Sequence, residues 1–163
     1  MIVSNSSPLV YLAALSDFNL LRNLFGGIAI PQAVFEEVVI GGAGLPVETH
    51  VREAIASSWL TVRPTVDAGE VERLCQAGLN RGESEAIVLA AELNAEALLM
   101  DDSDGVRFAR NAGITVVRTA GIFRLAKQRG LLDAIRPKID ALRREGFWLS
   151  DEHYRMIIES AGE

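Results

Sequence analysis

The sequence contains one cysteine, Cys75, and only two histidines, His50 and His153, in 163 residues. A lone cysteine cannot form a disulfide within the chain, so we expect a reducing, cytoplasmic setting. The scarcity of histidine and cysteine argues against a zinc site built from those residues and against a Ser-His-Asp triad. A metal ion in this protein would therefore need oxygen ligands.

Long apolar runs are also absent. No segment approaches the roughly 20 apolar residues that cross a membrane, and the first residues lack the basic and apolar regions of a signal peptide. We therefore expect no membrane partner. Hydrophobic residues make up 49% of the chain and charged residues 23%, which is ordinary for a globular protein. The length predicts a single domain over residues 1–163 that can bury its own core.

Charge is distributed unevenly along the chain. The net charge is −6, yet residues 103–144 contain ten Lys and Arg against three acids, whereas the remaining residues contain six Lys and Arg against nineteen acids. This asymmetry predicts a basic face for an anionic partner beside an acidic site. Solvated helix faces explain the same pattern equally well.

Short apolar runs alternate with helical patterns. Strands are predicted at 2–4, 28–30, 60–62, 97–100 and 115–117. Helices are predicted at 8–15, 17–25, 32–39, 46–57, 67–79, 82–93, 103–112, 120–129, 132–145 and 151–160, the first opened by Ser7-Pro8. The alternation predicts a three-layer α/β/α sandwich with a mainly parallel central sheet. Sites in such sheets lie beyond the carboxyl ends of the strands.

Polar side chains follow two of these strands. Asn5 comes directly after the first strand, while Asp101 and Asp102 follow the buried strand at 97–100, with Asp104 close behind. Each has an ordinary explanation as a turn residue or as a helix N-cap. Their common position at the carboxyl edge of the sheet makes them candidates for a site.

Two predicted helices bring further acids to the same edge. Glu36 and Glu37 precede an apolar run, and Glu83 and Glu85 open a helix that is otherwise almost wholly apolar and therefore buried. Complementing a helix dipole or facing solvent would explain each pair alone. Three segments that bring acids together would repel one another strongly unless a cation is bound. Oxygen ligands of this kind suit Mg²⁺ or Mn²⁺.

In order, spacing and context these residues resemble the PIN-domain nucleases, particularly the VapC-like toxins of prokaryotic toxin–antitoxin pairs. The resemblance runs over about residues 1–129, and 130–163 form a predicted C-terminal helical extension whose end, GFWLSDEHYRMIIESAGE, is similar to that of a little-characterised branch. The family positions are Asn5 in SNSSPL, Glu37 in IPQAVFEEV, Glu85 in GESEAIVLAA and Asp102 in LLMDDSDGVRFA.

The resemblance implies a cytoplasmic endoribonuclease that uses Mg²⁺ or Mn²⁺ to cleave RNA, pairs with an antitoxin protein and forms a homodimer. The implied metal ligands are Asn5, Glu37, Glu85, Asp101 and Asp102, of which Asn5, Glu37, Glu85 and Asp102 are also the catalytic set. The implied supporting residues are Ser7, Glu83 and Asp104, and those contacting the RNA backbone are Arg107 and Arg110.

The sequence departs from the family pattern at two positions. Asn5 replaces the usual Asp, and Glu85 replaces a second Asp, with Glu83 as a near alternative. An amide keeps one oxygen for a metal ion but removes a negative charge, which lowers the expected affinity. The first alternative is therefore a catalytically weakened or inactive PIN-like module that binds nucleic acid or a protein partner.

Other phosphate-handling α/β folds are a second alternative. A phosphorylation receiver and a haloacid-dehalogenase-like phosphatase both require acids directly after or at the end of the first strand, where this chain has Asn5. No Gly-x-Gly-x-x-Gly follows that strand, which disfavours a dinucleotide-binding domain.

Overall fold

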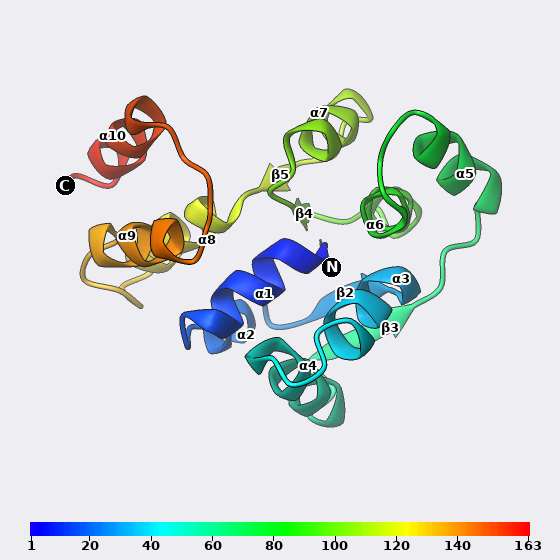
Figure 1. The fold of residues 1–163 in the computed structure, drawn as a ribbon, viewed down its shortest axis with the longest axis horizontal. Coiled ribbons are helices and arrows are strands. Elements are labelled where there is room, and N and C mark those ends of the chain that lie inside the picture. The colour runs from blue at the N-terminus through cyan, green and yellow to red at the C-terminus, as the bar shows by residue number, and fades with distance from the viewer.

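The computed structural model describes residues 1–163 and has a central sheet of five strands (Figure 1). The strands are β1 (Ile2–Ser4), β2 (Ile28–Pro31), β3 (Leu60–Arg63), β4 (Ala97–Leu99) and β5 (Val116–Val117). They lie in the order β3-β2-β1-β4-β5, and every neighbouring pair is parallel. The five predicted strands are confirmed to within one residue at each end.

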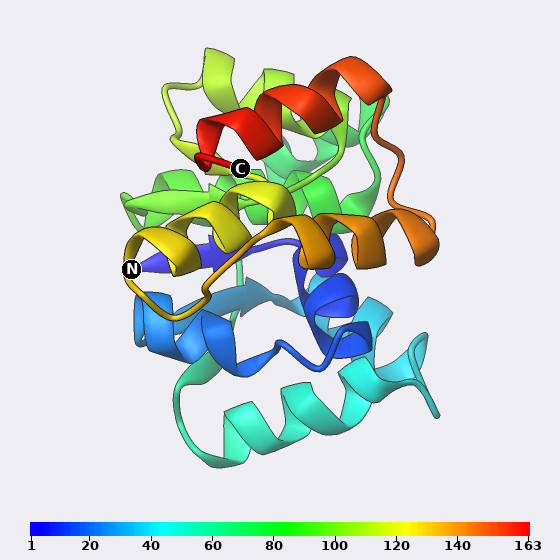
Figure 2. The same cartoon turned by 90° about the vertical axis from the view of Figure 1, so that its left-hand side faces the viewer.

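Alternate residues of each strand enter opposite layers of the core. Ile28 and Ile30 of β2 pack in one apolar cluster, while Ala29 packs in the other. The first layer contains α1 (Ser6–Ala14), α2 (Asn19–Phe25), α4 (Pro46–Ala56), α8 (Thr119–Gln128), α9 (Arg136–Arg144) and α10 (Asp151–Ser160), which lie in front in Figure 2. The second contains α5 (Ala68–Gln76), α6 (Arg81–Glu92) and α7 (Ser103–Asn111). The predicted three-layer sandwich is confirmed.

The helix expected at 32–39 is two segments. The short α3 (Gln32–Phe35) continues into η1 (Glu36–Ile40), a π-helical turn closed by a 2.9 Å bond from the Gly41 N–H to the Glu36 carbonyl. A π-helical turn redirects the side chains that follow it, and such turns are frequent at functional sites. This one carries Glu37.

Two helix starts differ from the prediction. Helix α1 begins at Ser6 with Asn5 at the N-cap, so Pro8 is its third residue, where the missing N–H is not needed by the helix. Helix α9 begins at Arg136, four residues later than predicted, because Pro137 occupies its first turn. No helix in the structure combines the length and apolar character needed to span a bilayer.

The C-terminal segment is fixed to the domain by side-chain contacts. The Glu163 carboxylate accepts hydrogen bonds from the backbone N–H of Ile135 (2.7 Å) and of Arg136 (3.1 Å), and it pairs with Lys127 Nζ at 3.0 Å. These contacts, the Ile135 N–H first, lower the pKa of Glu163 from 4.5 to about 2. The depressed pKa means that folding favours the ionised carboxylate.

We predict that Glu163→Gln lowers the melting temperature at pH 7. The stabilisation from Glu163 is complete above its unfolded pKa of 4.5 and is lost as pH falls toward its folded pKa of about 2. The difference in melting temperature between the two proteins should therefore narrow as pH is lowered from about 5 to about 3. The control is Glu159→Gln, an exposed acid of α10. A difference that stays constant with pH would contradict this role.

Candidate functional site

The site lies at the carboxyl edge of the sheet, where β1 and β4 run side by side. The backbone N–H of Asn5 donates to the Leu99 carbonyl at 2.9 Å, which extends the β1–β4 pairing by one residue. Asn5 is 4% exposed, and its side chain neither caps α1 nor bonds another side chain. The amide oxygen is therefore available at a buried position beside the residues that follow β4.

Glu37 is held between two helix starts. Ser6 Oγ, in the first turn of α1, donates a hydrogen bond to Glu37 Oε2. The other oxygen lies against the first turn of α6, where a Cβ added to Gly82 would stand 2.3 Å from Glu37 Oε1. The hydroxyl at this carboxylate belongs to Ser6, a residue that the sequence did not single out when it named Ser7 as a supporting residue.

Glu83 lies in the first turn of α6, directly after the Gly82 that Glu37 lies against. It forms a capping box with Asn80: Glu83 Oε2 accepts from the Asn80 N–H at 3.0 Å, and Asn80 Oδ1 accepts from the Glu83 N–H at 2.8 Å. Burial raises the pKa of Glu83, and the charges of Asp102, Glu37 and Asp104 raise it further against the opposing bond from Asn80. Glu83 is thus within electrostatic reach of three carboxylates from two other segments.

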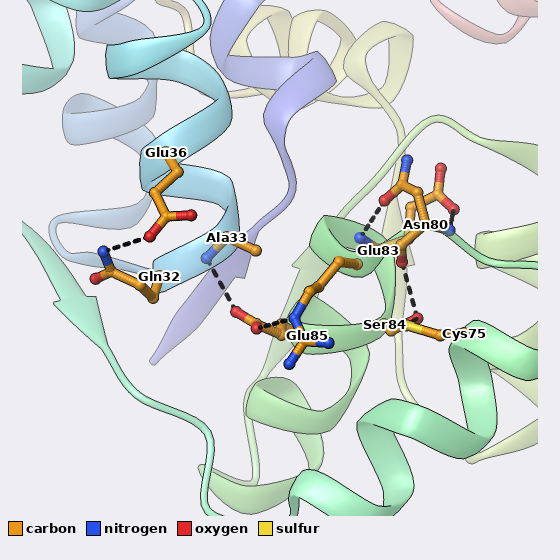
Figure 3. A network of polar contacts seen from close by, with 9 residues as sticks. Gln32, Ala33, Glu36, Cys75, Asn80, Glu83, Ser84 and Glu85 are labelled. Carbon is orange, nitrogen blue, oxygen red and sulfur yellow. Dashed lines mark hydrogen bonds and ion pairs between the residues drawn. The ribbon is translucent and has the colours of Figure 1, made fainter.

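Glu85 has different partners, although it is only two residues further along α6. Figure 3 shows its carboxylate turned toward Ala33, away from the Asn80–Glu83 pair. Glu85 Oε2 accepts from the Ala33 N–H at 2.9 Å, and Oε1 accepts from Arg81 Nε at 3.2 Å. Residues two apart on a helix do not share a face, so the two glutamates cannot both point at the acidic cluster.

Asp101 and Asp102 also diverge. Asp101 accepts two bonds from Thr119, at 2.8 Å from its N–H and 2.7 Å from its hydroxyl, which join the end of β4 to the start of α8. Burial raises the pKa of Asp101, and the bonds from Thr119 partly oppose that rise. Asp102 is exposed and caps α7 through Oδ1, which accepts from the Gly105 N–H at 2.9 Å. Its second oxygen has no such partner.

The remaining donor set is chemically suited to a hard cation. Glu37, Glu83 and Asp102 each commit one oxygen to a hydrogen bond and keep the other, and Asn5 adds an amide oxygen. All-oxygen donors of this kind suit Mg²⁺ or Mn²⁺. No three His, Cys, Asp or Glu side chains are arranged so that they could hold a metal ion. Glu37 and Asp102 are exposed, and rotation of their side chains would be needed to converge on one ion.

The two arginines expected to contact RNA lie in different surroundings. Arg107 pairs with Asp104 at 3.0 Å and lies over the Phe108 ring, whereas Arg110 lines a cavity together with Arg118 and Arg124. Neither Arg118 nor Arg124 was predicted from the sequence to contact RNA. The sequence did contain an indication for Arg118, because this residue directly follows β5 and so lies at the carboxyl edge that was predicted to carry the site.

We predict that Asp101→Ala and Asp102→Asn differ in stability. Asp101→Ala leaves the N–H and hydroxyl of the fully buried Thr119 without partners, which should reduce the free energy of unfolding by about 1–3 kcal/mol. Asn is as good an N-cap as Asp, so Asp102→Asn should stay within about 0.5 kcal/mol of the parent. Urea denaturation measures both. Equal losses would contradict the separate roles of the two aspartates.

Comparison with known proteins agrees with this architecture. A family model described as a PIN domain, DUF3368, matches residues 1–163. The solved structure of a PilT N-terminus domain protein, SSO1118 from the hyperthermophilic archaeon Sulfolobus solfataricus P2, is similar in fold, with a TM-score of 0.53 and 20% identity over 77% of this chain and 91% of that chain. No curated protein sequence matches this one. The chain therefore belongs to the PIN-domain family, whose members are generally metal-using nucleases that act on nucleic acids.

Proposed function

We propose that this chain is a Mg²⁺- or Mn²⁺-dependent endoribonuclease that hydrolyses RNA phosphodiester bonds. One observation carries the proposal: Glu37 lies against Gly82 in the first turn of α6, which also bears Glu83, and Asn5 pairs with the end of β4, which Asp102 follows, so acids from three segments lie near one another at the carboxyl edge of the sheet. Like charges gathered at one place destabilise the fold unless they serve a cation. Such clusters are characteristic of catalytic sites.

The residues of this site would have two kinds of role, which are binding the cation and positioning its ligands. Asn5, Glu37, Glu83 and Asp102 would hold the cation, with Glu83 taking the place that the sequence assigned to Glu85. Ser6 would keep Glu37 oriented through its hydrogen bond, and Asp101 would hold the Asp102 segment against α8. A bound divalent ion supplies an activated water and neutralises charge that develops on the phosphate.

The physiological part of the proposal is a toxin that is paired with an antitoxin protein, acts in the cytoplasm and forms a homodimer. It is supported by the resemblance of the four site motifs to VapC-like toxins and by membership of the PIN-domain family.

A second candidate function is a PIN-like module that binds RNA or a protein without cleaving. Asn5 is the observation in its favour, because an amide at the most buried position of the site supplies less charge to a cation than a carboxylate.

We predict Mn²⁺- or Mg²⁺-dependent cleavage of structured RNA that Asp102→Asn reduces by about 100-fold or more, since that change removes a charged ligand. Asn5→Asp restores a charge and should give equal or faster cleavage. Gel analysis of end-labelled RNA measures both rates. Cleavage unaffected by Asp102→Asn would place the activity elsewhere. Cleavage that appears only in Asn5→Asp would establish the non-cleaving module instead.

The two glutamates of α6 provide a matched comparison in the same assay. Glu83→Gln should reduce cleavage about as strongly as Asp102→Asn and leave folding intact. Glu85→Gln should lower the melting temperature and leave the dependence of the cleavage rate on Mn²⁺ concentration nearly unchanged. The reason is that the Glu85 carboxylate bonds Ala33 and Arg81. A strong loss of cleavage in Glu85→Gln, with little loss in Glu83→Gln, would indicate that Glu85 and not Glu83 binds the cation.

We also predict that Gly82→Ala impairs cleavage without changing any charge. The added Cβ would meet Glu37 Oε1 at 2.3 Å and displace that carboxylate. Small displacements of a catalytic group lower rates by up to about 100-fold. Gly69→Ala is the matched control, since Gly69 is likewise the second residue of its helix, α5, and its nearest neighbour is at 3.5 Å. Equal cleavage by the two variants would show that Glu37 need not lie against α6.

A further inference from the structure

Most of the basic residues between positions 103 and 144 are already engaged. Six of the ten Lys and Arg side chains pair with an acid or bond a backbone carbonyl: Arg107, Lys127, Arg129, Arg136, Lys138 and Arg143. Four have no such contact: Arg110, Arg118, Arg124 and Arg144. The basic excess of this segment is thus largely structural, and only a small remainder is available for a partner.

Three of the four unengaged arginines converge on one place. Arg110, Arg118 and Arg124 line a cavity of about 290 Å³, here called the arginine cavity. Its remaining walls are Val116, Val117, Ala120, Gly121, Ile157 and Ser160, so no acid lines it. A second cavity of about 200 Å³ shares Arg124 and Ser160 with the first and adds Lys127. The two cavities therefore adjoin one another between α8 and α10.

The arginine cavity is next to the acidic site. Val117 forms part of its wall, and the Val117 carbonyl accepts a 3.1 Å bond from the N–H of Met100, the residue just before Asp101. Arg118 lies between Val117 and Thr119, whose two bonds hold Asp101. The cavity thus begins beside the end of β5, the strand next to β4, and extends along α7 and α8.

The chemistry of the cavity fits a phosphate group joined to an apolar moiety. Guanidinium groups that line one cavity without an acid in its wall repel one another until an anion enters, and their planar forks match phosphate oxygens. The valine, alanine and isoleucine walls offer a surface for a sugar or a base. A cavity free of acids is notable in a chain whose net charge is −6.

We infer that the arginine cavity binds phosphate groups of the RNA strand whose scissile phosphate lies at the acidic site. This inference rests on the proposed function for the identity of the strand. It gives a role to three arginines that pair with no acid and share one cavity, and it places the strand along the protein from the end of β4 past β5 toward α10.

The test is binding of a fluorescent 2′-O-methyl oligouridine, measured by anisotropy in EDTA, which removes the divalent ion that the proposed cleavage requires. Arg110→Gln and Arg124→Gln should each weaken binding about fivefold to tenfold and reduce the slope of log K against log salt by about 0.7, the value for one phosphate contact on a single strand. Arg144→Gln is the matched control, because Arg144 is also exposed and unengaged but lies outside the cavity. It should change binding by less than about twofold.

Equal losses in all three variants would overturn the inference, since only overall charge would then matter. A poly-glutamate peptide that binds more tightly than the oligonucleotide, with the same dependence on Arg110 and Arg124, would also overturn it by assigning the cavity to an acidic protein. Arginine-dependent binding without Mn²⁺-dependent cleavage would support the cavity and refute the nuclease. Cleavage without arginine-dependent binding would refute the cavity alone.

Discussion

The hydrogen bond from the Asn5 N–H to the Leu99 carbonyl is the contact on which the site depends. It continues the pairing of β1, the central strand, one residue beyond the end of β1, onto the last residue of β4. Parallel pairing then brings the residues after both strands to one edge. The first turn of α1 follows immediately and delivers Ser6 to Glu37, so one backbone contact fixes the positions of two segments of the cluster.

The acids at this edge differ in their hydrogen-bond partners, and this difference distinguishes structural carboxylates from those available to a ligand. Asp101 and Glu85 bind backbone N–H groups of other elements, and so join β4 to α8 and α6 to α3. Glu83 and Asp102 instead cap their own helices with a single oxygen. Their second oxygens are available to a ligand. The repulsion between these carboxylates contributes, after burial, to the raised pKa of Glu83.

The sequence predicted the strands, the parallel sheet and the edge that carries the acids, because residue periodicity and strand order are local signals. It assigned Glu85 to the site with Glu83 as a near alternative, because both lie near the start of α6. The bond from the Ala33 N–H to Glu85 depends on the packing of α6 against α3, which the sequence does not show. Ser6 was missed because the start of α1 lies two residues earlier than Pro8 suggests. Arg118 and Arg124 became distinct only once the fold had paired the other basic residues.

The central claim is that Asn5, Glu37, Glu83 and Asp102 form one divalent-cation site. Anomalous diffraction from crystals grown with Mn²⁺ tests it most directly. We predict a manganese peak bounded by oxygens of Glu37, Glu83 and Asp102, which is weaker or absent in crystals of Asp102→Asn. A peak ligated by Glu85 or Asp101, or full occupancy in Asp102→Asn, would contradict it.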